Sequence, residues 1–183
     1  MKQVILGVTG SISAYKAADI VSRLVKLDCR VHVVMTKAGA SFITPLTMQA
    51  LSKNRVYVDA LQEEDPAEII HIALPQSADL LLIAPATANS IGKIAGGIAD
   101  DMLSSMVLAA HDIPMLLAPA MNTRMYENPA VQHNLETLRR RGWELIEPRE
   151  ARLACGDMGK GALAEVDVIV KAVIDQLSLG EGQ

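Results

Sequence analysis

The chain has 183 residues, a length typical of one compact domain with one sizeable core. Half of its residues are hydrophobic but only 3% are aromatic, so we expect an aliphatic core of the kind found in α/β proteins with buried strands. Its 17 basic and 21 acidic residues give a net charge of −4, which excludes the basic surface of a nucleic-acid-binding protein. No apolar run approaches the ~20 residues of a membrane-spanning helix, and the N-terminus lacks the long apolar segment of a signal peptide. We therefore expect a cytoplasmic protein without a membrane or nucleic-acid partner.

The N-terminal half alternates predicted strands with predicted helices. Gln3–Val8 is predicted as a buried strand, and Ser13 as the N-cap of a helix that runs to about Leu27. A second strand is predicted at Arg30–Met35. A helix then begins at Thr44-Pro45 and runs to about Leu51, and Val56–Val58 is a short strand. A polar loop at 62–66 then precedes a helix that carries His71.

The C-terminal half continues the same alternation. The strands expected here are Asp79–Ala84, Pro114–Ala118 and Trp143–Ile146. The helices between and after them are Ile91–Ala95, Asn128 to Gly142 and Glu165–Leu177. The segment Glu147–Leu163 has three glycines and little periodicity, so we interpret it as a functional flap. We see no linker or repeat and predict a single domain over residues 1–183, with a frayed tail from about residue 178.

This alternation predicts an open, mostly parallel sheet with helices on both faces. Ligands of such sheets bind outside the carboxyl ends of the strands. Three predicted strands are followed there by small polar turns, Gly10–Ser13, Thr87–Ser90 and Ala120–Asn122. We expect these turns to line one edge of the sheet.

The first of these turns is a candidate phosphate site, because a Gly/Ser turn that opens a helix presents backbone N–H groups. Its glycines do not form the dinucleotide fingerprint, and no acidic residue follows the second strand, which disfavours NAD. A mononucleotide such as FMN fits better, with hydroxyl and amide groups available from four residues: Thr36, Thr87, Asn89 and Ser90. The alternative is ordinary turn chemistry without a ligand.

Two reactive side chains stand out from their surroundings. His71 lies among aliphatic residues, where it is either a core histidine bonded to a carbonyl or a base tuned by its apolar neighbours. Cys155 lies in the glycine-rich segment near Arg152 and Lys160, a setting that favours a reactive thiol. The chain has only one other cysteine, Cys29, so we expect no disulfide framework, and we predict no metal site because no ligand cluster has the required spacing.

Six segments together carry a family resemblance: residues 10–14, the segment around His71, and residues 85–90, 92–101, 119–125 and 154–157. In order and spacing they resemble the flavin-dependent cysteine decarboxylases, and most of all the phosphopantothenoylcysteine decarboxylases of coenzyme A biosynthesis. One motif of that family is often Pro-Ala-Ser-Ala-Asn-Thr, where this chain has Pro85-Ala86-Thr87-Ala88-Asn89-Ser90. Both exchanges keep a hydroxyl group, so we expect cofactor binding to be retained.

The resemblance implies a flavodoxin-like or Rossmann-like fold and a homotrimer, or a multiple of trimers, with FMN at the subunit boundary. By the family's pattern, FMN would be held by Gly10, Ser11, Ile12, Thr36, Lys37, Ala38, Thr87, Ala88, Asn89, Ser90 and Ala120. The substrate would contact Asn122, Arg152, Leu153 and Ala154, and the catalytic pair would be His71 and Cys155.

The reaction implied by the resemblance is the decarboxylation of 4′-phosphopantothenoylcysteine to 4′-phosphopantetheine. The substrate would be oxidised to a thioaldehyde, lose CO2, and be re-reduced from the enethiol, with His71 as base and Cys155 as proton donor. Many relatives carry a fused ligase domain, so we expect either a free-standing enzyme with a separate ligase partner or a fragment of a bifunctional protein. Two alternatives remain: an oxidative decarboxylase of peptidyl C-terminal cysteine, which stops at the enethiol, and a non-catalytic regulatory protein of the same fold.

Overall fold

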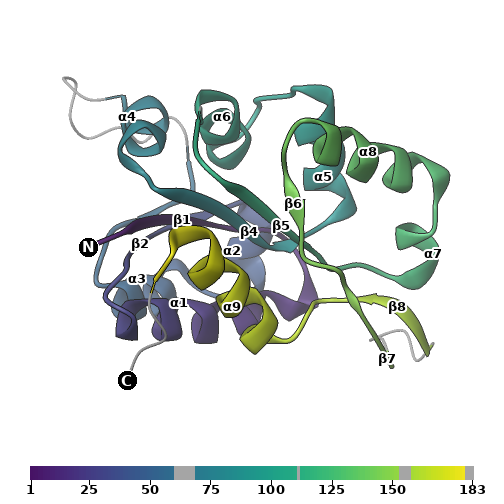
Figure 1. The fold of residues 1–183 in the computed structure, drawn as a ribbon, viewed down its shortest axis with the longest axis horizontal. Coiled ribbons are helices and arrows are strands. Elements are labelled where there is room, and N and C mark those ends of the chain that lie inside the picture. Colours follow the sequence, from purple (N-terminus) through teal and green to yellow (C-terminus); the bar gives the residue numbers. More distant parts are fainter. Residues whose placement is uncertain (60–68, 111, 153–157, 180–183) are drawn as a thin grey trace.

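The computed structural model describes residues 1–59, 69–110, 112–152 and 158–179. Its centre is a six-stranded sheet of order β3-β2-β1-β4-β5-β6, in which every neighbouring pair is parallel (Figure 1). The strands are β1 (Gln3–Val8), β2 (Arg30–Met35), β3 (Val56–Tyr57), β4 (Leu80–Ala86), β5 (Met115–Pro119) and β6 (Glu144–Leu145). The open parallel sheet predicted from the alternation of elements is confirmed.

Helices cover both faces of the sheet. Figure 1 shows α1, α3 and α9 on one side and α4, α5, α6 and α8 on the other. The bounds are a 3-10 turn η1 (Ile12–Tyr15), α1 (Lys16–Lys26), α2 (Lys37–Phe42), α3 (Pro45–Ser52), α4 (Ile70–Ser77), α5 (Ala88–Gly96), α6 (Met102–Ala109), α7 (Thr123–Tyr126), α8 (Pro129–Arg140) and α9 (Val166–Leu177). Among the described residues, no helix is long and apolar enough to cross a bilayer.

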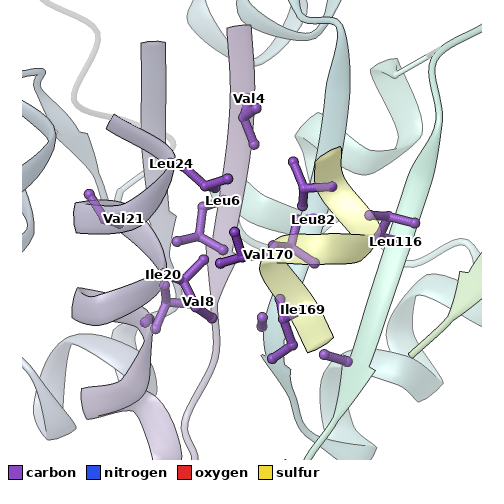
Figure 2. Packing of buried hydrophobic residues seen from close by; sticks show 14 of the residues in the cluster. Val4, Leu6, Val8, Ile20, Val21, Leu24, Leu82, Leu116, Ile169 and Val170 are labelled. Carbon is purple, nitrogen blue, oxygen red and sulfur yellow. The ribbon is translucent and has the colours of Figure 1, made fainter. Parts of the chain in front are cut away.

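The core has two layers because side chains of a strand point alternately to opposite faces. On β1, Leu6 and Val8 belong to the cluster that includes α1 and α9, whereas Ile5 belongs to the cluster on the other face. Figure 2 shows the first layer, in which Ile169 of α9 and Leu82 of β4 are among the labelled side chains. All five of these side chains are completely buried, and each contributes about 1.5–3 kcal/mol by leaving water.

Several predicted elements need correction. The predicted helix begins with the 3-10 turn η1, which is capped by Ser11 and not by Ser13: Ser11 has an extended backbone, and its hydroxyl oxygen accepts a hydrogen bond from the Ser13 N–H. The helix α1 follows without a side-chain cap. The segment interpreted as a functional flap contains an antiparallel hairpin that its weak periodicity did not indicate, β7 (Arg149–Arg152) and β8 (Met158–Ala162), while its role as a flap stays a prediction. The hairpin projects beyond the six-stranded sheet, next to α7 (Figure 1).

Candidate active site

Thr9 connects the carboxyl ends of the two central strands, β1 and β4. Its side chain is completely buried, and its hydroxyl donates a hydrogen bond to the Pro85 carbonyl oxygen at 2.7 Å. The same hydroxyl oxygen accepts a hydrogen bond from the Thr87 backbone N–H at 3.0 Å. The strand order reverses between β1 and β4, which is where open α/β sheets bind their ligands. Thr9 therefore holds two loops together at the expected ligand site.

The loop after β1 approaches α2 more closely than a side chain would permit. A Cβ atom built on Gly10 would lie 2.5 Å from the Cβ atom of Ala38, well inside van der Waals contact. A Cβ atom on Gly39 would lie 2.4 Å from the Val8 carbonyl oxygen. The absence of side chains at Gly10 and Gly39 thus allows the start of α2 to pack directly against the end of β1.

Threonine hydroxyl groups begin the two helices that follow β2 and β4. The Thr36 oxygen accepts a hydrogen bond from the Gly39 N–H at 3.0 Å, and the Thr87 oxygen accepts one from the Ser90 N–H at 3.4 Å. Both threonines are in the extended conformation that N-cap residues prefer. The starts of α2 and α5 therefore lie at the same edge as η1, where N-terminal backbone N–H groups favour polar or anionic ligand groups.

A cavity of about 940 Å³, called here the first cavity, lies at this edge and has the volume of a small-molecule site. The eleven residues expected to hold FMN all line it: Gly10, Ser11, Ile12, Thr36, Lys37, Ala38, Thr87, Ala88, Asn89, Ser90 and Ala120. They follow β1, β2, β4 and β5 and are more than 100 positions apart at the extremes. The fold thus brings the eleven residues together in one cavity. That these residues bind FMN stays a prediction.

A charged cluster without an expected role also lines the first cavity. The Lys93 ammonium lies 2.7 Å from Asp100 Oδ1 and 3.0 Å from Asp101 Oδ2. The hydrogen bonds that the ammonium donates to these two carboxylates raise the pKa of Lys93. Burial tends to raise the pKa of Asp101, but the Ser104 N–H and Lys93 outweigh it, so this pKa lies below its ordinary value. Both shifts favour the charged forms of Lys93 and Asp101. Sequence reasoning gave Lys93, Asp100 and Asp101 no role, although all three lie in one of the segments that carry the family resemblance.

A second cavity, of about 410 Å³, adjoins the first. Ser11, Ile12, Ala120 and Met121 line both cavities, and Asn122, the expected substrate residue, lines the second. The Asn122 side-chain oxygen accepts a hydrogen bond from the Arg124 N–H at 2.8 Å and so begins α7. Asn122 is therefore held at a helix start beside the boundary between the two cavities.

Glycine allows β8 to close one side of the second cavity. Gly161 has φ +146°, and a Cβ atom there would lie 2.5 Å from the Met121 carbonyl oxygen. The Met121 N–H donates a hydrogen bond to the Gly161 carbonyl oxygen at 2.9 Å. The hairpin is thereby attached to the loop after β5, which carries Asn122.

Comparison with known proteins places the chain in a family. The family model described as Flavoprotein matches residues 1–178. The chain belongs to the Flavoprotein family. It is 50% identical over 177 residues to a probable phosphopantothenoylcysteine decarboxylase of Streptococcus mutans, covering 96% of this chain and 99% of the relative. It is 49% identical to the coenzyme A biosynthesis bifunctional protein CoaBC of Bacillus subtilis, with 93% of this chain matching 42% of that longer protein.

Solved structures of similar proteins have the same fold. A cysteine-to-serine variant of a PPC decarboxylase complexed with pantothenoylaminoethenethiol has a TM-score of 0.86 and 34% identity, and the match covers 97% of this chain and 98% of that one. The FMN-dependent cysteine decarboxylase SpaF has a TM-score of 0.83 and 33% identity, with the same coverage of both chains. The flavodoxin-like fold implied by the resemblance is confirmed.

Of the expected catalytic pair, His71 and Cys155, the structure describes only His71. His71 is partly buried in the first turn of α4 and, in the part of the chain that the structure describes, lines neither of the two cavities. Cys155, Leu153 and Ala154 lie outside the described residues, and of Arg152 only the backbone, in β7, is described. Their roles stay predictions.

Other groups with metal-binding or titratable side chains have ordinary surroundings. Burial lowers the pKa of His32 on β2 and raises the pKa of the Cys29 thiol, so both groups favour their neutral forms. His133 lies on the exposed side of α8. Within the described ranges, no three or more His, Cys, Asp and Glu side chains gather in a group that could hold a metal ion.

Proposed function

We propose that the protein decarboxylates 4′-phosphopantothenoylcysteine to 4′-phosphopantetheine with FMN as cofactor, as a step of coenzyme A biosynthesis. The observation that carries this proposal is the first cavity, lined by all eleven expected FMN residues in a chain that matches a decarboxylase relative over nearly its whole length. Names of two similar structures, an FMN-dependent cysteine decarboxylase and a PPC decarboxylase, give independent support.

The residues of the first cavity fit FMN. Hydroxyl groups of Thr36, Thr87 and Ser90 and the amide of Asn89 can bond to phosphate, ribityl and ring atoms, and the side-chain-free Gly10 keeps the loop close to α2. Ala and Met side chains supply apolar surface for a planar ring. FMN, when bound, supplies a reversible acceptor for a hydride, that is, for two electrons and a proton.

The chemistry of the substrate suggests a role for each of the other expected site residues, His71, Asn122 and Cys155. A cysteine α-carboxylate has no electron sink, so direct loss of CO2 would leave an unstabilised carbanion, whereas prior oxidation of the side chain to a thioaldehyde provides one. In this scheme, His71 takes the proton during the oxidation, the Asn122 amide orients the carboxylate, and Cys155 returns a proton when the enethiol is reduced.

We further propose that a homotrimer, or a multiple of trimers, completes each site. His71 lies outside the lining of both described cavities, so a neighbouring subunit is the natural source of the base. Large apolar side chains that line the two cavities are exposed, with Ile12 at 63%, Tyr15 at 62% and Met125 at 49%, and a subunit boundary would bury them. The bifunctional relatives support a ligase as functional partner, and the expected cytoplasmic location stays a prediction.

The decisive experiment is anaerobic mass spectrometry of the product formed from 4′-phosphopantothenoylcysteine by the FMN-loaded protein. Loss of CO2 alone is expected. Loss of CO2 together with two hydrogens would instead identify an oxidative decarboxylase. Unchanged substrate would refute the proposal and favour a binding role.

Two variants test the catalytic assignments. His71→Asn is expected to abolish turnover, and His133→Asn is the matched control because His133 lies exposed on α8. Cys155→Ser is expected to release the decarboxylated but oxidised enethiol. Full conversion to 4′-phosphopantetheine by either His71→Asn or Cys155→Ser would remove that residue from the reaction.

A further inference from the structure

The second cavity differs from the first in charge. The titratable side chains that line the first cavity are Lys37 and Lys93 together with three aspartates, Asp59, Asp100 and Asp101. Lys16 and Arg149 line the second cavity, and among the described residues no carboxylate does. The second cavity is therefore the place near the active site where positive charge is in excess.

The two cations are held in place rather than free in solvent. The Lys16 side chain is only 16% exposed, and its ammonium lies 3.8 Å from Glu165 Oε2, the outer limit of an ion pair. Arg149 Nε lies 3.1 Å from Glu165 Oε1 and donates a hydrogen bond to the Leu163 carbonyl oxygen. A single carboxylate thus faces two cations, so one positive charge is left uncompensated.

Other cations near the site are placed differently. Lys160 lies on the same hairpin as Arg149, but its ammonium is 2.7 Å from Glu147 Oε2, a carboxylate that also pairs with Arg139, and Lys160 lines neither cavity. The ammonium of Lys93 has two aspartates within 3.0 Å. A dianionic ligand group in the second cavity therefore meets Lys16 and Arg149, whereas Lys93 in the first cavity attracts it less because two aspartates compensate its charge.

We infer that Lys16 and Arg149 bind the terminal phosphate of the substrate in the second cavity, with Glu165 positioning both cations. This inference rests on the proposed function. Asn122, which would orient the substrate carboxylate, lines the same cavity, so one molecule can contact all three residues. A guanidinium matches the geometry of phosphate oxygens and an ammonium adds a point charge, which is the combination that phosphate recognition uses.

The test compares two substrates, 4′-phosphopantothenoylcysteine and its dephosphorylated form, pantothenoylcysteine. Lys16→Gln and Arg149→Gln are each expected to reduce the preference for the phosphorylated compound roughly 10- to 100-fold, mainly through KM. Lys171→Gln is the matched control, since it removes the same charge from an exposed pair with Asp175 on α9. Its preference is expected to be unchanged.

Glu165→Gln separates phosphate binding from a structural role. If the three residues only stabilise the fold, removal of the carboxylate should impair activity in the same way as removal of either cation. If the cations bind phosphate, Glu165→Gln should instead lower KM for the phosphorylated substrate by roughly twofold or more, because a competing anion is gone. Calorimetry with 4′-phosphopantetheine and pantetheine should give the same ranking of affinities without turnover.

Three results would overturn the inference. An unchanged substrate preference in both cation variants would place the phosphate elsewhere. Loss of FMN from these variants, with substrate preference retained, would assign the cations to the cofactor phosphate. Failure of the unsubstituted protein to decarboxylate either compound would refute the proposed function and this inference together, a result distinct from the other two.

Discussion

Replacement of Thr9 by valine tests whether a single hydroxyl group holds the ligand site together. Valine keeps the shape of threonine, but the Thr87 N–H loses its acceptor, which costs about 1–3 kcal/mol for a group withdrawn from water. The Pro85 carbonyl oxygen keeps its bond from the Thr9 N–H at 3.3 Å, so the loss there is about 1 kcal/mol or less. The added methyl group returns about 0.8 kcal/mol. The net expectation is a loss of about 2 kcal/mol.

Urea unfolding of the FMN-free protein measures this loss. With a slope of about 2 kcal/mol per M, the midpoint should fall by about 1 M. The dissociation constant for FMN should rise about tenfold, because Thr87 begins α5 and lines the first cavity. Thr9→Ser is the control: it keeps both hydrogen bonds, loses a methyl group worth about 1 kcal/mol, and should bind FMN normally.

Two results would refute this reasoning. If Thr9→Val unfolds within about 0.5 kcal/mol of the unsubstituted protein, the buried hydroxyl is not needed by its two partners. If Thr9→Ser loses as much FMN affinity as Thr9→Val, the effect comes from the methyl group, and the link between β1 and β4 is not what shapes the cavity.

Gly10→Ala should weaken FMN binding about tenfold or more, because its Cβ atom would clash with that of Ala38, whereas Gly92→Ala in α5 should be tolerated and gain about 0.5–1 kcal/mol in unfolding free energy. Equal FMN affinity in equilibrium titrations of these two variants would contradict the assignment. Asp101→Asn keeps the cap of α6 but loses the charge paired with Lys93. Since the folded pKa of Asp101 is lowered, its contribution is complete above the unfolded pKa of about 3.9 and disappears as the pH falls through the folded value. Acid unfolding curves of the two proteins should therefore converge below about pH 4, and a constant difference would oppose the argument.

Local chemistry in the sequence was sufficient for most elements. The aliphatic runs of β1 and β2 have the predicted bounds, because a strand buried on both faces contains few polar residues. Thr44-Pro45 and Asn128-Pro129 begin α3 and α8 as predicted, since an N-cap side chain and a proline in the first turn act within four residues.

The elements that sequence reasoning missed lack a local pattern. Five of the eight residues of α6 are buried, so the helix has no polar face from which a helical period could be recognised. The helix α2 is only six residues long. The β7–β8 hairpin consists mainly of charged residues and glycines, and its attachment through Gly161 to Met121 depends on a loop 40 positions away.

The sequence by itself determined most of the strands and helices along the chain, the polar turns after the strands, and the segments that carry the resemblance to cysteine decarboxylases. Only the tertiary structure decided which groups meet, because sheet order places loops from distant parts of the chain at one edge. Thr9 thus bonds to Pro85 and Thr87, and Glu165 faces both Lys16 and Arg149. These contacts depend on the relative position of strand ends, a property that neither hydrophobic periodicity nor capping chemistry encodes.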